Sequence, residues 1–311
     1  MESGNGAAGY WLQQGLNGLF LATLYAVLAT AYALLQGITN RIILSFGDIA
    51  TFGAFAAVSV AVWAMLQGFN GVFILLPALG AAALVTSALG RASHAGIFGP
   101  FAASTGQTVM ITSIGLSIVL QEVLRIQSAG RDLWLPPLFD ASLPLLDGAF
   151  PVRIGFTQLA AAGISWVALV LLHLAMRRSA AGRQWRAVAQ NARLAALCGV
   201  SADRVFGWTF ATAAGFAGLA GSILAVTYGG VSFAMGLMLG FKAMFASIIG
   251  GFGTLSGAIV GGLFLAGLEV AWTAVFPASY RDVVVFAIII MVLVLKPEGL
   301  TGHAMRRDHD Q

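Results

Sequence analysis

Long apolar runs separated by short polar segments dominate this chain. Two shorter runs lie at residues 240–252 and 283–295. The other runs are close to the roughly 20 residues that a helix needs to cross a bilayer core about 30 Å thick, and they cover residues 15–36, 48–66, 71–90, 106–126, 155–176, 206–228 and 256–276. The pattern predicts an all-α, polytopic membrane helix bundle of about eight to nine transmembrane segments, some of them short or broken.

Composition agrees with this class, because 59% of the residues are hydrophobic and only 9% are charged, more apolar surface than a soluble domain can bury. Residues 1–14 contain no Lys or Arg and so lack the basic region of a cleavable signal peptide. We therefore expect the first apolar run to be a retained helix.

Basic residues indicate the topology. Residues 177–204 carry six arginines against one acid, Asp203. Lys and Arg accumulate in cytoplasmic loops, so we place this loop inside and alternate the other segments from it. The resulting cytoplasmic residues are Arg41, Arg91, Lys296, Arg306 and Arg307, and the external ones are Arg125, Arg131, Arg153 and Arg281. We attribute the pI near 9.6 to these clustered basic residues and their role in membrane topology, not to nucleic-acid binding.

These assignments divide the chain into three parts. They predict an external N-terminal segment over residues 1–14, a transmembrane domain over 15–302 that includes the cytoplasmic loop 177–204, and a cytoplasmic tail over 303–311. The N-terminus is then outside and the C-terminus inside.

Two interruptions in the apolar pattern point to a transport path. Residues 240–252 reach only about 20 Å as a helix, too short to cross lipid unaided. Gly47 and Asp48 belong to a similar break between the first two runs. Paired helix breaks in two halves of a transporter expose backbone groups near the midplane, where a polar solute can meet them. Asp48 can instead be a helix N-cap, the interpretation that we favour for it.

Charges inside the apolar runs are few. Glu122 and Arg125 lie three residues apart, on one helix face, and can neutralise each other. Lys242 and Glu269 lie in separate runs and can pair across helices. These groups are either structural ion pairs or residues that line or gate the solute path.

Glycine spacing predicts close helix packing in the last third of the chain, because Gly253, Gly257 and Gly261 recur every four residues. The glycines at 250–253 do not form a phosphate loop, since no Gly-Lys-Ser/Thr follows them. Zinc-ligand spacings and nucleophile motifs are also missing from the sequence. We therefore expect no catalytic site, no metal site and no cofactor on this chain.

The loop 177–204 contains an amphipathic helix that Gly199 ends. Trp185, Val188 and Ala189 share one face, and Arg183, Arg186 and Arg193 occupy another. Such a helix can lie on anionic membrane lipid or dock onto a soluble cytoplasmic partner.

Several motifs resemble those of a known family. The stretches GRQWRAVAQN at 182–191 and AALCGV at 195–200 are similar to the coupling segment of ABC importer permeases. Support comes from LSFGD at 44–48, TSIGLS at 112–117, FASIIGGFGTLSGA at 245–258 and KPEGLTG at 296–302. Over residues 15–302 the chain looks like a LivH-type branched-chain amino acid ABC permease. It departs from the family at Phe46, where a His commonly precedes Gly47.

The resemblance implies a permease subunit of an ATP-driven importer in the bacterial cytoplasmic (inner) membrane, for branched-chain amino acids or a related small polar solute. Its implied partners are a second, LivM-like permease, two cytoplasmic ABC ATPases, which hydrolyse the ATP, and a periplasmic solute-binding protein. Residues that would couple to the ATPases are Arg183, Arg186, Ala189, Arg193 and Gly199. Candidates for the translocation path are Gly47, Asp48, Thr112, Gly115, Glu122, Lys242 and Glu269.

Three alternatives stay open at this point. A related ABC permease could carry urea or short amides. A self-contained secondary transporter could couple to ions through Lys242, Glu269 and Glu122 and would need no ATPase. A purely structural membrane subunit would leave the interrupted segments unexplained.

Overall fold

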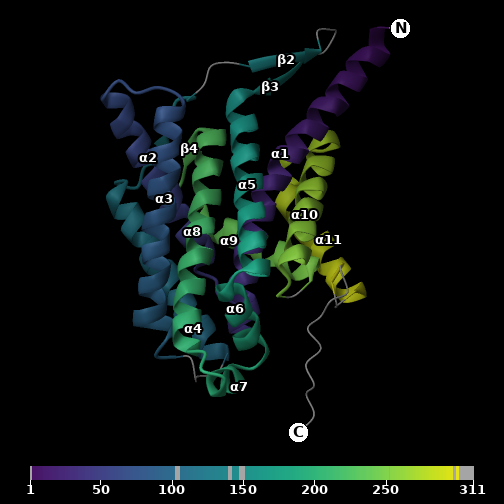
Figure 1. Cartoon of the computed structure of the whole chain (residues 1–311). Coiled ribbons are helices and arrows are strands. Elements are labelled where there is room, and N and C mark those ends of the chain that lie inside the picture. Colours follow the sequence, from purple (N-terminus) through teal and green to yellow (C-terminus); the bar gives the residue numbers. More distant parts are fainter. Residues whose placement is uncertain are drawn as a thin grey trace.

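A computed structural model of the chain describes residues 2–101, 106–138, 142–146, 151–251, 253–296 and 299–300, with only the backbone described for 2–8, 142 and 146. Most of the described residues lie in helices that run roughly side by side, with short strands gathered toward one end (Figure 1). The predicted tail, residues 303–311, and Phe252 of the 245–258 motif lie outside the described residues.

Within the described residues, eight helices are long and apolar enough to cross a membrane. They are built from α1 (Glu2–Thr39), α2 (Phe46–Leu66), α3 (Val72–Ser93), α4 (Gly106–Gln127), α5 (Phe156–Arg178), α8 (Ala202–Tyr228), α10 (Leu255–Val275) and α11 (Arg281–Leu295). A π-helical turn, η1 (His94–Phe98), extends α3, and a 3-10 turn, η2 (Ala278–Tyr280), precedes α11. The predicted polytopic helix bundle is confirmed.

The described part of the chain also contains three shorter α-helices: α6 (Ala180–Gln190), α7 (Ala192–Leu197) and α9 (Gly236–Gly250). The last of these is the predicted short segment, which begins four residues earlier than the apolar run suggests. The first helix also starts earlier than predicted. It begins at Glu2 and so includes most of residues 1–14, the segment that we predicted to precede the first span.

The core of the bundle lies along α1, α2 and α8. Helix α1 packs extensively against α10, and α8 packs against both α2 and α3. Helices α1 and α8 are mostly buried, whereas α5 and α11 keep most of their surface on the outside of the bundle. The exposed side chains of α5 are large and apolar, as a surface in contact with lipid requires.

Glycines allow α2, α3 and α8 to approach closely. A side chain on Gly218 would collide with Thr86 of α3, and one on Gly221 would collide with the backbone of Ala50 in α2. Gly53 in turn faces the Cα atom of Gly218. Small residues at such crossings bring helix backbones into direct contact, which is the main source of helix association in a membrane.

Two small antiparallel pairs of strands lie at one end of the bundle. Strand β1 (Leu133–Trp134) pairs with β4 (Gly230–Val231), and β2 (Ser142–Leu146) pairs with β3 (Val152–Gly155) through a bulge between Pro144 and Leu146. No strand was predicted here, because runs of two to five residues are too short for a strand periodicity to stand out. The all-α prediction therefore holds for the membrane region, and these strands are an addition to it.

Specific contacts show which segments share an end. At the strand end, the Arg153 backbone N–H donates to Gln13 Oε1 at 3.0 Å. At the other end, Trp185 of α6 donates to the Leu34 carbonyl of α1, and His94 contacts Asp203 at 3.0 Å. We call these the strand end and the arginine end, because the second also holds the arginines of α6 and α7 (Figure 1).

Candidate translocation and coupling sites

Helix α2 begins inside the bundle rather than at its edge. After α1 ends, the chain reverses at Asn40, whose φ is 54°. The backbone N–H of Ile43 then donates to the Tyr32 hydroxyl at 3.4 Å, and the Phe46 ring packs edge-on against the Tyr32 ring at 5.2 Å. Tyr32 lies about 10 Å from the end of α1, at 1.5 Å per residue. The start of α2 is therefore re-entrant.

Helix α9 begins against this re-entrant start. A Cβ on Gly47 would overlap the carbonyl of Gly236, and the Gly47 N lies 3.1 Å from the Cβ position of Gly240. Gly236 in turn faces Asp48 and Thr51 of α2. The two helix breaks predicted separately from the two halves of the sequence thus meet at one place in the structure, which we call the α2–α9 junction.

Asp48 connects this junction to α4. The carboxylate is fully buried and accepts hydrogen bonds from the Ser117 hydroxyl and from Gln121 Nε2, the latter at 2.9 Å. It is the third residue of α2; Ser45 holds the N-cap position, and its side chain makes no capping hydrogen bond. The N-cap interpretation of Asp48 is therefore wrong, because the partners of the carboxylate lie on another helix.

Helix α4 presents an unusual exposed face. Gly115 has nothing within 4 Å of its Cβ position, and Thr112 donates to the Thr108 carbonyl of its own helix. Glu122 and Arg125 form the expected ion pair, with both side chains about half exposed. Gly115, Ile118 and Glu122 follow one another at helical spacing, so they lie along one stripe. A stripe with an open glycine and two charges differs from an ordinary lipid-facing surface.

A buried ion cluster lies elsewhere in the bundle. Lys242 Nζ of α9 is 2.7 Å from Glu269 Oε1 of α10 and 3.1 Å from Asp282 Oδ1 of α11. Tyr25 of α1 donates to Glu269 Oε2 at 2.9 Å, and Arg281 approaches the same carboxylate at 3.8 Å. The pairing expected between Lys242 and Glu269 thus forms within a cluster of two cations and two anions. Sequence reasoning missed Tyr25 and Asp282, which belong to two further helices, α1 and α11.

The segment after α5 is anchored by a tryptophan. The Trp185 indole is buried, its Nε1 donates to the Leu34 carbonyl at 3.2 Å, and its ring lies close to Gly37. Gly182 packs so tightly on the Met176 backbone that no side chain could replace its hydrogen. The Ser179 hydroxyl accepts from the Gly182 N–H and caps α6. The apolar face of the predicted amphipathic helix thus points into the bundle.

The predicted single helix is broken into two at Asn191. The Asn191 side chain accepts from the N–H groups of Arg193 and Leu194 and so starts α7. Gly199, with φ of 81°, follows the end of α7 as expected. Ala189 is half-buried at the end of α6.

The predicted coupling arginines divide into two groups. Arg186 Nη1 donates to the Met176 carbonyl and Arg183 Nη1 donates to the Arg178 carbonyl at 3.3 Å, so both satisfy the last turn of α5. Arg193 instead lies exposed at the start of α7. Sequence reasoning missed the apolar residues beside it: Leu194 is 59% exposed and Leu197 is 82% exposed, and Cys198 is exposed as well. We call Arg193, Leu194, Leu197 and Cys198 the α7 patch.

Two of the three predicted packing glycines lie in α10. A side chain on Gly257 would collide with the Gly250 carbonyl, and one on Gly261 would collide with the Ala246 carbonyl, so both glycines face α9. Gly253 lies in the turn before α10 and has φ of 73°, a conformation that favours glycine. Its regular spacing with the others is therefore not a helical stripe.

The comparisons with known proteins agree on one family. Residues 15–293 match the family described as "Branched-chain amino acid transport system / permease component". The chain is 32% identical over 296 residues to the high-affinity branched-chain amino acid transport system permease protein LivH of Salmonella typhimurium, covering 94% of this chain and 96% of that protein.

Two further relatives show the spread of the similarity. The permease protein BraD of Pseudomonas aeruginosa is 29% identical over the same shares of the two chains. The autoinducer 2 import system permease protein LsrC of Klebsiella pneumoniae is 29% identical over 64% of this chain and 57% of its own. The comparison with solved structures gave no match.

Proposed function

This chain belongs to the family of branched-chain amino acid transport system permease components, and on that premise we propose that it is the permease subunit of an ATP-driven importer for branched-chain amino acids. The observation that carries the proposal is the similarity to LivH over 94% of the chain together with an anchored helical segment at the arginine end. The partners are a second permease subunit, two cytoplasmic ATPases and a periplasmic solute-binding protein.

The proposed orientation puts the arginine end in the cytoplasm. Arg41 donates to the Phe101 carbonyl, and Arg91 lies against Gly207 near the His94–Asp203 pair, so these cations gather at the end that holds α6 and α7. Lys and Arg accumulate on the cytoplasmic side of membrane proteins. The strand end then faces the periplasm, and the N-terminal end of α1 lies outside.

The α7 patch is the proposed contact with an ATPase subunit. Its leucines expose large apolar surface at a membrane boundary, next to the cation of Arg193. Trp185 fixes the preceding helix to α1, so a push on α7 is transmitted to the bundle through a buried contact rather than through a flexible loop. The family's coupling segment thus has a rigid part, α6, and an exposed part, α7.

The exposed face of α4 is the proposed lining of the path, shared with the second permease subunit. Gly115 leaves room for another backbone or a solute, and Glu122 and Arg125 supply polar groups in the same stripe. Asp48 holds this helix against the α2–α9 junction. A movement of the junction would therefore be passed directly to the path-lining helix.

The secondary-transporter alternative has less support. It would couple ions through Lys242, Glu269 and Glu122, but Glu122 is paired with Arg125 and Glu269 with Lys242, which fits structural ion pairs. The two pairs also lie on different helices and do not form one relay. The importers of urea or amides, and of other solutes, differ from this proposal in cargo only.

The test is uptake by the reconstituted importer. The chain would be purified with its native partner subunits, placed in liposomes with its binding protein, and assayed for ATP-driven uptake of radiolabelled leucine. We expect uptake in the wild type and none in Leu197→Asp, because an aspartate would be buried without a partner at the ATPase contact. The matched control is Leu143→Asp, an exposed leucine of β2 at the strand end, which should transport normally.

One result would overturn the proposed function, and another would overturn the proposed ATPase contact. Accumulation of leucine by this chain alone in liposomes that carry an ion gradient, without ATPases, would establish a secondary transporter. Normal ATP-driven uptake by Leu197→Asp would exclude the α7 patch as the ATPase contact.

A further inference from the structure

A cavity of about 290 Å³ lies between α1, α5 and α8 near the strand end. This volume is at the lower limit of ligand sites, which span about 300–1,000 Å³. It lies at the last turn of α8 and the first turns of α5, and its wall on α1 runs from Asn17 to Leu24. Neither the α2–α9 junction nor the α4 face contributes to its lining.

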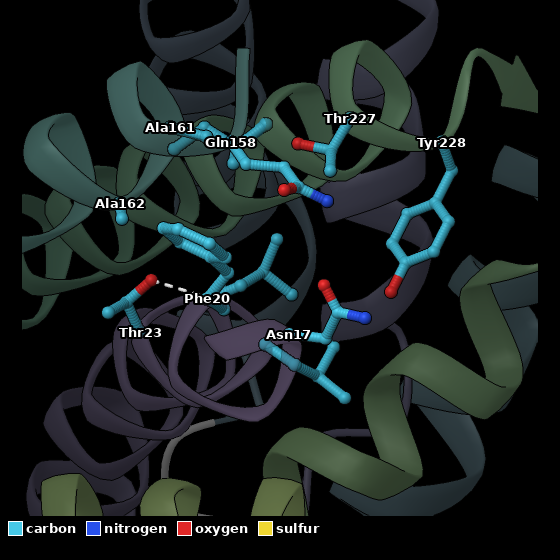
Figure 2. A pocket seen from close by; sticks show the side chains of 11 residues that line it. Asn17, Phe20, Thr23, Gln158, Ala161, Ala162, Thr227 and Tyr228 are labelled. Carbon is cyan, nitrogen blue, oxygen red and sulfur yellow. Dashed lines mark hydrogen bonds between the residues drawn. The ribbon is translucent and has the colours of Figure 1, made fainter. Parts of the chain in front are cut away.

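Polar groups from all three helices line the cavity. Figure 2 shows the carboxamides of Asn17 and Gln158 directed toward the space between α1 and α5, with the Thr227 side chain beside Gln158. Gln13 Nε2 donates to Asn17 Oδ1 at 3.3 Å, while Gln13 Oε1 accepts from the Arg153 backbone. This chain of bonds from β3 holds Asn17 with its amide hydrogens available to a ligand.

Thr227 supplies a second indication of a ligand. Its Oγ1 is buried and has no hydrogen-bond partner among the described residues. A buried hydroxyl without a partner is destabilising, so such groups call for a specific explanation. Thr212 of the same helix, by contrast, donates to the Trp208 carbonyl at 2.8 Å. Because Oγ1 has almost no accessible surface, a bound polar molecule would become its partner once the Thr227 side chain rotates toward the cavity.

The rest of the wall is apolar except for the hydroxyls of Thr23, which donates to the Phe20 carbonyl, and Tyr228. Phe20 and Leu24 of α1 and Ile223 of α8 form an aliphatic and aromatic surface. The small side chains of Ala161 and Ala162 leave room for a ligand on the side of α5. The described lining residues include no Asp, Glu, Lys or Arg. A ligand with net charge would lose its hydration without gaining a counter-charge. The lining suits a small molecule with an aliphatic part and a compact polar head of zero net charge.

We propose that this cavity is a binding site for a zwitterionic branched aliphatic amino acid, which would receive the solute at the periplasmic end of the permease. Carboxamide and hydroxyl donors would bind the carboxylate, the carboxamide oxygens would bind the ammonium, and Phe20, Leu24 and Ile223 would contact the side chain. The proposal rests on the proposed function for the class of solute and for the orientation of the chain.

The position of the site relative to the ion cluster is part of the proposal. Leu24 lines the cavity, and the next residue, Tyr25, bonds Glu269 in the cluster. Because consecutive helix residues project about 100° apart, α1 places the two sites on adjoining faces of one helix turn. A ligand in the cavity would therefore contact α1, the same helix that contributes Tyr25 to the ion cluster.

The experiment is direct binding to the permease–ATPase complex in nanodiscs, without the binding protein. Radiolabelled leucine is the probe, and lysine and urea are the competitors. We expect saturable leucine binding that excess valine displaces and lysine does not. Thr227→Val, which removes the hydroxyl at constant shape, should weaken leucine binding about tenfold, whereas the matched Thr212→Val should leave it unchanged. Ala162→Phe should abolish binding by filling the space.

The outcomes separate this inference from the proposed function. If the wild-type importer takes up leucine but Thr227→Val and Ala162→Phe bind and transport it like the wild type, the cavity site is excluded and the transport function stands. Photocrosslinking of a phospholipid acyl chain, rather than of leucine, to a probe at Ala162 would also exclude the site. If the intact importer takes up no leucine but leucine still binds and Thr227→Val weakens that binding, the proposed function fails and the cavity site stands; if leucine binds neither the wild type nor the variant, both fail.

Discussion

Lys242 Nζ lies 2.7 Å from Glu269 Oε1, and both side chains are almost completely buried. This pair joins α9, which is too short to cross a membrane on its own, to α10, which is long enough. Tyr25 adds α1 to the cluster and Asp282 adds α11. The cluster therefore holds α9 in place through the charges of Lys242 and Glu269, which are buried inside the bundle where neither water nor lipid solvates them.

Glu269→Gln should destabilise the permease strongly, because it leaves the buried Lys242 with Asp282 as its remaining anion. Breaking a buried ion pair from one side is destabilising by about 3–5 kcal/mol, and the remaining contact puts the expected loss toward the lower limit. Thermal unfolding of the purified protein, followed by tryptophan fluorescence, measures it.

The control for this variant is the exposed pair of α4, where Glu122→Gln should change the unfolding temperature little. The double variant Lys242→Met with Glu269→Leu should recover much of the stability lost in Glu269→Gln, since it removes both charges together. A double variant no more stable than the single one would show that the two side chains do not act as a pair.

Gly257→Leu should prevent folding or assembly, because its side chain would collide with the Gly250 carbonyl of α9. Gly267→Leu in the same helix is the matched control, since nothing lies within 4 Å of its Cβ position. The yield of monodisperse protein after detergent extraction distinguishes them. Equal yields of the two variants would contradict the close contact between α9 and α10.

Asp48→Asn should reduce both stability and uptake, because the neutral amide weakens the hydrogen bonds from Ser117 and Gln121 and places an additional buried N–H₂ group at the α2–α9 junction. A lost charged hydrogen bond of this kind is destabilising by about 1.5–3 kcal/mol. Ser117→Ala should have a smaller effect, since Gln121 still donates to Asp48. Unfolding temperature and leucine uptake are measured together. Wild-type values of both in Asp48→Asn would show that the charge of Asp48 contributes to neither stability nor transport.

Trp185→Ala should uncouple ATP hydrolysis from transport. The substitution removes the hydrogen bond to the Leu34 carbonyl and empties the space against Gly37, so α6 loses its fixed position under α1. Deleting a buried tryptophan side chain is destabilising by about 3–5 kcal/mol at the site. We expect ATPase activity in the assembled importer to persist while its stimulation by loaded binding protein is lost.

Trp185→Phe separates the two contributions, because it keeps most of the ring and removes only the N–H donor. It should retain partial coupling, between the wild type and Trp185→Ala. If Trp185→Ala transports at the wild-type rate per ATP hydrolysed, the anchored segment does not transmit the movement.

The coupling arginines illustrate a limit of sequence reasoning. Arg183, Arg186 and Arg193 share a basic helical face in the sequence, but the break at Asn191 separates them. Arg183 and Arg186 turn back onto the carbonyls that end α5, and only Arg193 stays in the exposed patch. Charge reversal at Arg186 therefore tests the end of α5 as much as it tests docking, which is why Leu197 serves as the probe.

Asp48 and the glycines show the same limit at closer range. The position of Asp48 near the start of a helix suggested a cap, yet its partners are Ser117 and Gln121 of α4, about 70 residues away. The regular spacing of Gly253 with Gly257 suggested one stripe, yet the helix starts between them. For Asp48 the neighbouring helix decided the role, and for Gly253 the position of the helix start did.

The sequence by itself determined the membrane class, the approximate spans, the two interrupted segments and the family resemblance, because these depend on hydropathy, glycine placement and short motifs within one stretch of chain. The tertiary structure decided that the two interruptions meet at Gly47 and Gly236, that Tyr25 and Asp282 complete the ion cluster, and that α1, α5 and α8 enclose a cavity beside Thr227. These features join residues tens to hundreds of positions apart. Apolar periodicity shows which face of a helix is buried, but it does not identify the helix that covers that face.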